Sequence, residues 1–335
     1  MKKSTTVILA AGLLLLAQAA YAGPGKKGSF GFSLSGEMRL INGGDLNGMV
    51  RDWNKLMADP DMADYSPKID WQEIKTVPMF GAEIFYHVSS RFAVSFGVEY
   101  MKKKNSGLAS LGWSDEYEYE DVDGYYLITE DYTSDYSPDV TVSAVPLTLN
   151  AYYYLPVGKW GQAFAKAGIG YYLAKMESVY TIKQNFSYED EYYYLGSLVS
   201  TYIAEDDSNS VISNSAKGNA LGFHVGLGFE LNMSSALALV VEAGFRQADL
   251  KNWDGEATLN YTYSEQYGYL PDELYTYTDS GSESYSGRLI FMEDALYDGD
   301  SLVLVENPDW DYLDSRPAVI KLGGPSLKIG VKIRL

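Results

Sequence analysis

Apolar and polar residues alternate with a period of two in eight separate segments of the chain. The clearest segment has an apolar residue at every second position from Leu221 to Leu231. The other seven segments cover residues 30–40, 80–88, 92–100, 145–153, 163–171, 237–246 and 327–335. A period of two places successive side chains on opposite faces of a strand. The pattern therefore predicts eight β-strands, each with one apolar and one polar face.

The connections between these segments alternate between short and long. Turns of a few residues, at 89–90, 156–158 and 233–235, follow the second, fourth and sixth segments. The four other connections are long and cover approximately residues 42–76, 102–140, 175–217 and 247–317. Short turns at one end and long loops at the other are typical of transmembrane β-barrels. We therefore expect an all-β fold, an eight-stranded antiparallel transmembrane β-barrel with long extracellular loops that extra hairpins extend.

The two faces of the expected strands differ in charge. The apolar face has no charged residue in any segment, and a lysine or arginine there would cost roughly 2–4 kcal/mol at the middle of a bilayer. A soluble β-sandwich also alternates, but its solvated face has no need of so much glycine. The polar face is therefore expected to line a narrow lumen with compensating charges. The members of this lumen charge network are Glu37, Arg39, Glu83, Glu99, Lys166, Glu230, Glu242, Arg246, Lys328, Lys332 and Arg334.

Residues 1–22 have the pattern of a secretory signal peptide. Two lysines precede an apolar stretch at residues 7–16, and Ala20-Tyr21-Ala22 supplies a cleavage site with small residues at both ends. The apolar stretch is shorter than the roughly 20 residues of a membrane-spanning helix. We expect export through the Sec pathway and a mature chain, residues 23–335, that forms a single β-barrel domain.

Charge and composition narrow the possible functions. The formal net charge is −19, which argues against nucleic acid as a partner. The chain has no cysteine, so it has no disulfide and no thiolate metal site. Its two histidines, His87 and His224, lie on the polar face, where a structural pairing with Glu83 or Glu230 is expected. No serine–histidine–acid pattern or zinc site is recognisable, so we expect neither an enzyme nor a cofactor.

The chain resembles the small bacterial outer-membrane β-barrels of the OmpA, OmpX and OmpW type. The resemblance rests on the signal peptide, the eight alternating strands and the last strand, in which Leu327, Ile329, Val331, Ile333 and Leu335 alternate with polar residues. That strand is similar to the family's recognition signal for the barrel-assembly machinery, although the family usually ends in phenylalanine and this chain ends in Leu335. The resemblance implies a location in the bacterial outer membrane, with lipid and lipopolysaccharide as partners.

The first long loop contains an amphipathic segment. Apolar residues recur at helical spacing, namely Leu46, Met49, Val50, Trp53, Leu56 and Met57. The pattern predicts a short helix that packs over the barrel mouth. A helix that lies in the outer leaflet with Trp53 as its anchor, or a plug of a hydrophobic path, are the alternatives.

The other three long loops are acidic and rich in tyrosine, as in residues 116–121, 188–192 and 261–263. Alternating tyrosine, threonine and acids suggest that strands continue beyond the bilayer as twisted hairpins. A loop of the length of 247–317 rarely stays without secondary structure, so we expect one or two extra hairpins there.

Acidic clusters in these loops have the oxygen ligands that calcium prefers. The clusters are Asp131, Asp135 and Asp139; Asp298 and Asp300; and Asp309, Asp311 and Asp314. None of them matches the twelve-residue calcium-binding loop. We therefore expect no bound metal, with calcium binding as the lesser alternative.

The sequence therefore favours a non-enzymatic outer-membrane barrel whose acidic, tyrosine-rich loops mediate surface interaction or shielding, with an unidentified extracellular ligand. A narrow channel for small or hydrophobic molecules is the second hypothesis. A soluble, secreted β-sandwich adhesin is the third.

Overall fold

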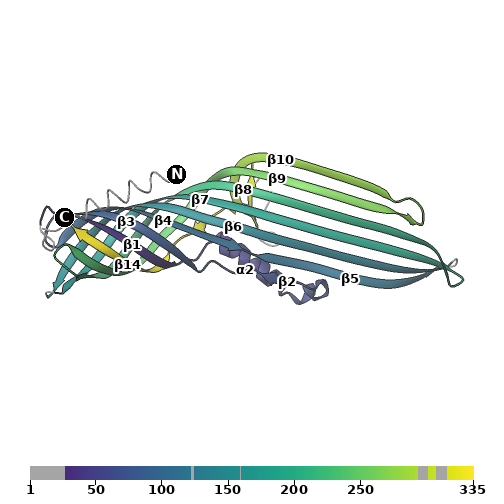
Figure 1. Cartoon of the computed structure of the whole chain (residues 1–335), viewed down its shortest axis with the longest axis horizontal. Coiled ribbons are helices and arrows are strands. Elements are labelled where there is room, and N and C mark those ends of the chain that lie inside the picture. The colour runs from purple at the N-terminus through teal and green to yellow at the C-terminus, as the bar shows by residue number, and fades with distance from the viewer. Residues whose placement is uncertain (1–26, 122–123, 159, 293–300, 307–314) are drawn as a thin grey trace.

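The computed structural model describes residues 27–121, 124–158, 160–292, 301–306 and 315–335, so the expected signal peptide lies outside the described residues. Eight antiparallel strands pair around a closed ring. In ring order they are β1 (Phe30–Leu40), β3 (Thr76–His87), β4 (Phe92–Ser106), β6 (Gly124–Val157), β7 (Gly161–Tyr194), β8 (Ser197–Asn232), β9 (Leu237–Leu270) and β14 (Gly324–Arg334). β14 pairs with both β9 and β1, which closes the ring (Figure 1).

Each of the eight alternating segments lies in one strand of this ring, with the predicted parity. In β1, for example, Leu34 and Met38 are exposed on the outside, whereas Ser33 and Glu37 are buried inside. The predicted fold class, an eight-stranded antiparallel transmembrane barrel with extended loops, is confirmed. A β-sandwich has two stacked sheets, and this ring is a single closed sheet, so the sandwich alternative is wrong.

The three short turns lie at the same end of the barrel. In two of them a serine hydroxyl supports the turn: Ser89 Oγ accepts hydrogen bonds from the backbone of Arg91 and Phe92, and Ser234 Oγ accepts them from Ala236 and Leu237. Serine favours such turns because its hydroxyl can replace a backbone acceptor. We call this end of the barrel the turn end.

At the other end the strands do not stop where their apolar residues stop. β6, β7, β8 and β9 have 34, 34, 36 and 34 residues and continue as paired strands far beyond the ring. β5 (Leu108–Asp121) extends β4 along the edge of β6, and β10 (Tyr275–Met292) pairs with β9. The long loops 102–140 and 175–217 are therefore hairpins, and 247–317 contains the predicted extra hairpin. We call the strands β5 to β10 beyond the ring the extension sheet; Figure 1 shows its length.

The remaining elements cover the mouth of the barrel. The first long loop forms α2 (Asp45–Met57), a 3-10 helix η2 (Pro60–Tyr65) and β2 (Lys68–Asp70), which pairs with β5. The last loop returns through β11 (Ser301–Val305), β12 (Ser315–Pro317) and β13 (Ile320–Lys321). Among the described residues, no helix is long and apolar enough to cross a membrane.

Candidate functional site

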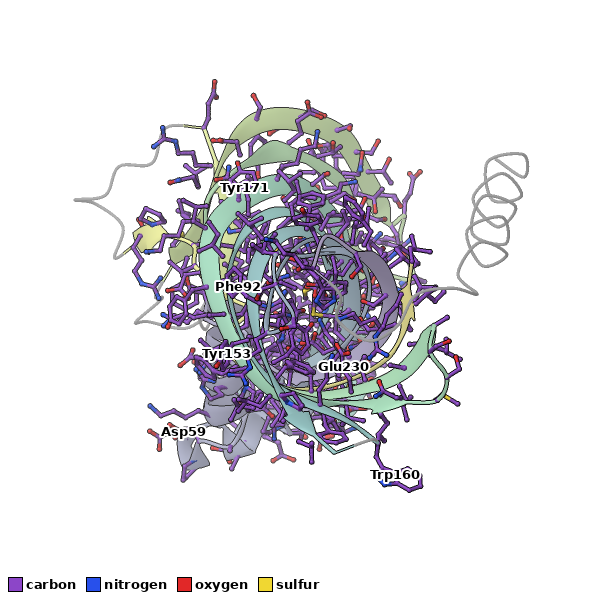
Figure 2. The ribbon with its side chains drawn as sticks, turned by 90° about the vertical axis from the view of Figure 1, so that its left-hand side faces the viewer. Asp59, Phe92, Tyr153, Trp160, Tyr171 and Glu230 are labelled. Carbon is purple, nitrogen blue, oxygen red and sulfur yellow. The ribbon has the colours of Figure 1, made fainter. Side chains whose placement is uncertain are left out.

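The outside of the ring has a belt of exposed apolar side chains. Phe80, Leu221 and Leu227, for example, are 67%, 77% and 69% exposed. Large exposed apolar surfaces of this kind mark contact with a membrane or with another protein. Aromatic residues lie near the turn end, among them Phe92, Tyr153 and Trp160 (Figure 2). An outward apolar band bordered by aromatic residues is the surface that a β-barrel presents to lipid.

The inside of the ring contains all eleven members of the lumen charge network, and none of them is more than 9% exposed. Near the turn end, Glu230 accepts hydrogen bonds from Lys332 Nζ at 2.7 Å, Arg334 Nη2 at 3.0 Å and Gln162 Nε2 at 2.7 Å. Lys332 also donates to the hydroxyl of Tyr154 at 2.9 Å. This carboxylate is therefore surrounded by three donors from two strands, β14 and β7.

In the middle of the barrel, Glu83 is held mainly by neutral donors. Its Oε1 accepts from Asn150 Nδ2 at 2.6 Å, from the Tyr152 hydroxyl at 2.8 Å and from the Ser95 hydroxyl. The other carboxylate at this level, Glu242, pairs with Lys166, with 3.3 Å between nitrogen and oxygen.

The third group of charges lies just below the mouth. Arg246 forms two hydrogen bonds to Glu99, one of them 3.1 Å long, and Lys328 Nζ lies 3.1 Å from the same carboxylate. Lys328 is also 3.6 Å from Glu37, which pairs with Arg39. Ion pairs with complementary hydrogen bonds allow charged groups to be buried in this way.

These side chains fill the lumen. One cavity, between Glu83, Tyr152, Glu230 and Lys328, has a volume of about 20 Å³, room for about one water molecule. The predicted histidine pairs are wrong in detail. His224 contacts Asn150 and reaches Glu83 only through that amide, and His87 has no hydrogen-bond partner among the described residues. The alternating pattern of the sequence correctly predicted that both imidazole rings point into the lumen, but it could not predict which side chains they contact.

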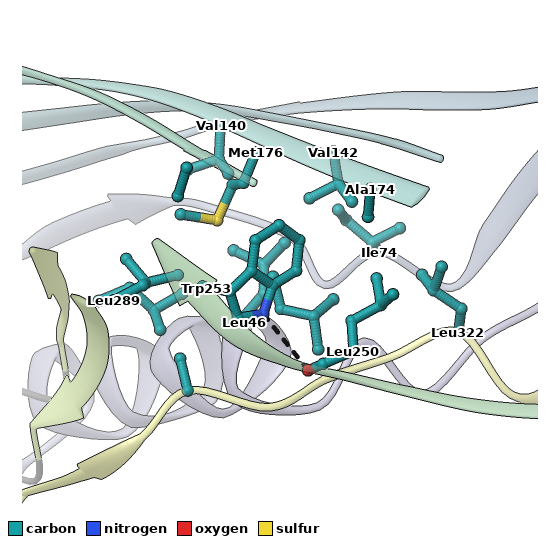
Figure 3. Packing of buried hydrophobic residues seen from close by; sticks show 14 of the residues in the cluster. Leu46, Ile74, Val140, Val142, Ala174, Met176, Leu250, Trp253, Leu289 and Leu322 are labelled. Atoms are coloured by element: carbon teal, nitrogen blue, oxygen red, sulfur yellow. Dashed lines mark hydrogen bonds between the residues drawn. The ribbon is translucent and has the colours of Figure 1, made fainter. Parts of the chain in front are cut away.

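Above the charges, an apolar cluster closes the mouth. α2 contributes Leu46, Met49 and Val50, which are buried against ring strands and against Trp253 (Figure 3). The indole of Trp253 donates to the carbonyl of Leu250 at 3.3 Å and lies against Gly218, where a Cβ would be 2.5 Å from the ring. The predicted helix over the mouth is thus present.

Two polar side chains attach α2 to its surroundings. Asn47 exchanges hydrogen bonds of 2.9 and 2.8 Å with the backbone of Ile74, and Asp45 accepts two from Arg316, at 2.7 and 2.8 Å. Trp53 stacks on Tyr136 with 4.8 Å between ring centroids. The alternative in which Trp53 anchors an interfacial helix in lipid is therefore wrong, because its ring faces the sheet.

The side-chain parity of the lumen continues into the extension sheet and produces a face dominated by tyrosine. Strand pairing and ring contacts place the same tyrosines side by side, as in Tyr126–Tyr192 and Tyr202–Tyr269. We call this surface the tyrosine face; its tyrosines are Tyr117, Tyr119, Tyr126, Tyr132, Tyr136, Tyr180, Tyr188, Tyr192, Tyr202, Tyr261, Tyr263, Tyr267, Tyr269, Tyr275, Tyr277 and Tyr285.

The charges on the tyrosine face all have one sign. At its described positions in β5 to β10 there is no lysine or arginine, whereas acids recur at Asp115, Glu130, Asp190, Asp206, Glu265, Asp279 and Glu283. Some tyrosines bond to these acids, as in Tyr263 to Asp206 at 3.2 Å. The opposite face carries mainly threonine, serine, asparagine and acids, with Tyr125 and Tyr193 near the tip.

Sequence reasoning noted the tyrosines but missed their segregation to one face. The signal was present as parity: beyond the ring, the tyrosines of β6 other than Tyr125 stand at even positions, 126, 132 and 136, and those of β9 stand at odd positions, 261 to 269. Only the strand register shows that the even residues of one strand and the odd residues of another share a face.

Two of the aspartates considered as calcium ligands, Asp139 and Asp135, instead contact lysine or serine side chains. Asp139 lies 2.7 Å from Lys104 Nζ and accepts from Ser106 at 2.9 Å, an arrangement that lowers the pKa of its carboxyl. Asp135 accepts from Ser110 at 2.5 Å. Within the described ranges, no group of three or more His, Cys, Asp or Glu side chains is arranged to hold a metal ion. The clusters at 298–300 and 309–314 lie outside the described residues.

No protein-family model and no curated protein matches the chain. Among solved structures, the chain is similar to the outer membrane protein OprG from Pseudomonas aeruginosa, with 11% identity over 92% of this chain and 97% of that chain and a TM-score of 0.33. The siderophore receptor PirA from Pseudomonas aeruginosa matches with 6% identity over 92% of this chain and 81% of that chain, with a TM-score of 0.11. The fold of this chain is defined by its own strand pairing, in which β14 closes the ring between β9 and β1.

Proposed function

We propose that this β-barrel is anchored in the outer membrane by its apolar belt and that it holds the extension sheet outside the cell as a recognition surface. The observation that carries the proposal is the tyrosine face. Strands in water can form a sheet with β-forming residues such as tyrosine and threonine on either face. Sheet formation alone therefore does not require the tyrosines to gather on one face.

Tyrosine suits recognition for physical reasons. The side chain provides a large contact area, loses little conformational entropy on binding, and combines an apolar ring with a hydrogen-bonding hydroxyl. On this face many rings remain accessible to solvent, for example Tyr119 at 55% and Tyr277 at 54%. Acids without any base make the surface selective for neutral or positively charged partners.

The barrel itself serves as the anchor in this proposal. The buried ion pairs inside the ring and the apolar cluster of α2 above them support this role over the narrow-channel alternative.

The test compares two triple variants made on the same two strands, β9 and β10. One replaces Tyr261, Tyr263 and Tyr277 on the tyrosine face with alanine. The matched control replaces Thr262, Ser264 and Thr278 on the opposite face with alanine. Fluorescent bacteria that display the native chain or either variant are applied to arrays of glycans and extracellular proteins.

We expect the native chain to give a discrete set of bound spots that the control keeps and the tyrosine variant loses. Equal display is checked with a peptide tag in the turn at Leu195–Gly196. Identical spot patterns for all three strains, or for displaying and non-displaying cells, would refute recognition by this face.

A further inference from the structure

The tip of the extension sheet contains a cavity of about 480 Å³ between β8, β9 and β10. Four members of the tyrosine face line it: Tyr202, Tyr267, Tyr269 and Tyr275. The ring centroids of Tyr202 and Tyr269 are 5.0 Å apart with the planes inclined at 58°, and those of Tyr267 and Tyr275 are 5.8 Å apart at 26°. The cavity is therefore walled by aromatic rings in two orientations.

The strand register explains why these rings converge. Tyr202 is paired with Tyr269, and Tyr267 is paired with Tyr275 on one side and with Ala204 on the other. The four rings therefore come from two neighbouring rows of the sheet. On β9 both rows lie next to the turn that joins β9 to β10, so the cavity lies at the end of the β9–β10 hairpin, and β7 and β8 continue beyond it to their own turn at residues 195–196.

The turn itself closes one side of the cavity and brings negative charge to it. Gly268 has a φ of +154°, and a Cβ there would lie 3.0 Å from the carbonyl oxygen of Glu273 and 3.1 Å from the side chain of Leu274. The absence of a side chain thus lets the turn fold back against β9. Asp272 and Glu273 in this turn line the cavity, and none of its lining residues is basic.

We propose that this tip cavity binds organic cations that carry a trimethylammonium group. Rings of tyrosine attract a cation to their faces, and weakly hydrated quaternary ammonium groups are the cations that aromatic cages recognise. Asp272 and Glu273 add long-range attraction without the dense oxygen ligands that calcium needs. Anions are repelled by the same charges, and a lysine ammonium is more strongly hydrated and harder to transfer from water.

The rings are available for such a ligand. Tyr267 and Tyr275 are 37% and 64% exposed, so they are not consumed by packing within the sheet. This inference rests on the proposed function only in that the tip must reach the external medium; the cavity test below uses purified protein and none of the residues varied in the array test.

The experiment titrates choline into the full-length protein, refolded in a maltoside detergent because phosphocholine detergents carry the proposed ligand. Heat of binding is measured by calorimetry, and the neutral isostere 3,3-dimethylbutanol is titrated in parallel. We expect the isostere, which has the same shape without the charge, to bind about tenfold more weakly. Equal binding of both compounds, or no binding of choline, overturns the proposal.

Substitutions then test whether choline binds at the tyrosine rings of the tip cavity. Tyr269→Leu removes a ring and is expected to weaken choline binding about tenfold, whereas Tyr269→Phe keeps the ring and retains most of it. Tyr193→Leu, near the tip on the opposite face, is the matched control. All variants are first checked for a heat-dependent gel shift, so a loss of binding is read only in a folded barrel. Equal effects of Tyr269→Leu and Tyr193→Leu would place the choline elsewhere and refute the site.

A final arm distinguishes the two sources of the same chemical group. Vesicles of phosphatidylcholine are added as competitors, with phosphatidylglycerol vesicles as the control. Competition by phosphatidylcholine alone supports a site that accepts a lipid headgroup on a membrane surface. Absence of competition, with choline binding intact, supports a site for the free cation. Equal competition by both vesicle types would show that membrane adsorption and not the cage governs binding, against the proposal.

Discussion

Glu230 illustrates how single residues keep charge inside the barrel. It lies on β8, and its partners Lys332 and Arg334 lie on β14, two strands away around the ring. The alternating pattern of β8 and β14 predicts that all three side chains point inward. The pattern cannot predict that they meet, because the stagger of the strands and the closure of the ring decide which inward residues share a level.

Replacing Glu230 with glutamine is expected to destabilise the barrel by about 3–5 kcal/mol, because Lys332 and Arg334 would then be buried without a counter-charge. The measurement is the urea midpoint of the heat-dependent gel shift in detergent. Glu120→Gln, at an exposed position of β5, is the control and should leave the midpoint unchanged. Equal midpoints for the two variants would contradict a structural role of the Glu230 ion pairs.

At the scale of elements, the sequence predicted which segments form strands better than where they end. The apolar alternation of the fourth segment begins at residue 145, yet β6 begins 21 residues earlier, at Gly124. A strand needs an apolar face only in the part that contacts lipid. Outside the bilayer, tyrosine and threonine are sufficient to form the strand. For α2, helical spacing predicted the helix but not its environment, because the same apolar stripe fits lipid or a protein core.

The packing of α2 makes the mouth sensitive to high pH. Tyr136 stacks on both Trp53 and Tyr180, and burial raises the pKa of Tyr180 to about 12. The unfolded chain loses this proton near pH 10, roughly the ordinary tyrosine pKa. The neutral phenol therefore stabilises the folded state fully below pH 10, and this contribution falls as pH rises towards the folded pKa of about 12.

Titration of tyrosinate absorbance in the native protein and in Tyr180→Phe tests this prediction. The difference between the two curves reports the missing phenol, and its midpoint is expected near pH 12. Tyr193→Phe, which removes a half-buried phenol near the tip, serves as the comparison. A midpoint near pH 10 for Tyr180 would show that the ring is solvated and that the mouth cluster is open.

At the scale of the whole molecule, one set of strands forms both the anchor and the external sheet. The ring and its inward charges could be derived from alternation alone, because lipid and lumen impose opposite requirements on the two faces. The tip cavity could not, since it depends on Tyr202, Gly268 and a turn that come together only through the register of three strands.

Because the inward side chains of the ring form ion pairs with one another, we expect the barrel to conduct no ions even without the extension sheet. A variant with hairpins cut at the paired positions Ser110–Asp135, Lys183–Asn209 and Thr258–Ser284 keeps every strand of the ring. In planar bilayers, we expect the native chain and this variant to show no conductance above baseline, while both keep the heat-dependent gel shift. Conductance that appears only in the shortened variant would show that the loops gate a pore.

The unbroken course of β6 to β9 has a mechanical consequence. Tension applied at the tip of the sheet is transmitted along the strands directly into the part of the barrel held by lipid, with no flexible linker between them. Inter-strand hydrogen bonds lie perpendicular to antiparallel strands, so pulling along the strands loads many of them together in shear. A cell attached through this tip would therefore be tethered by a stiff rod that resists drag as a unit and does not unravel one bond at a time.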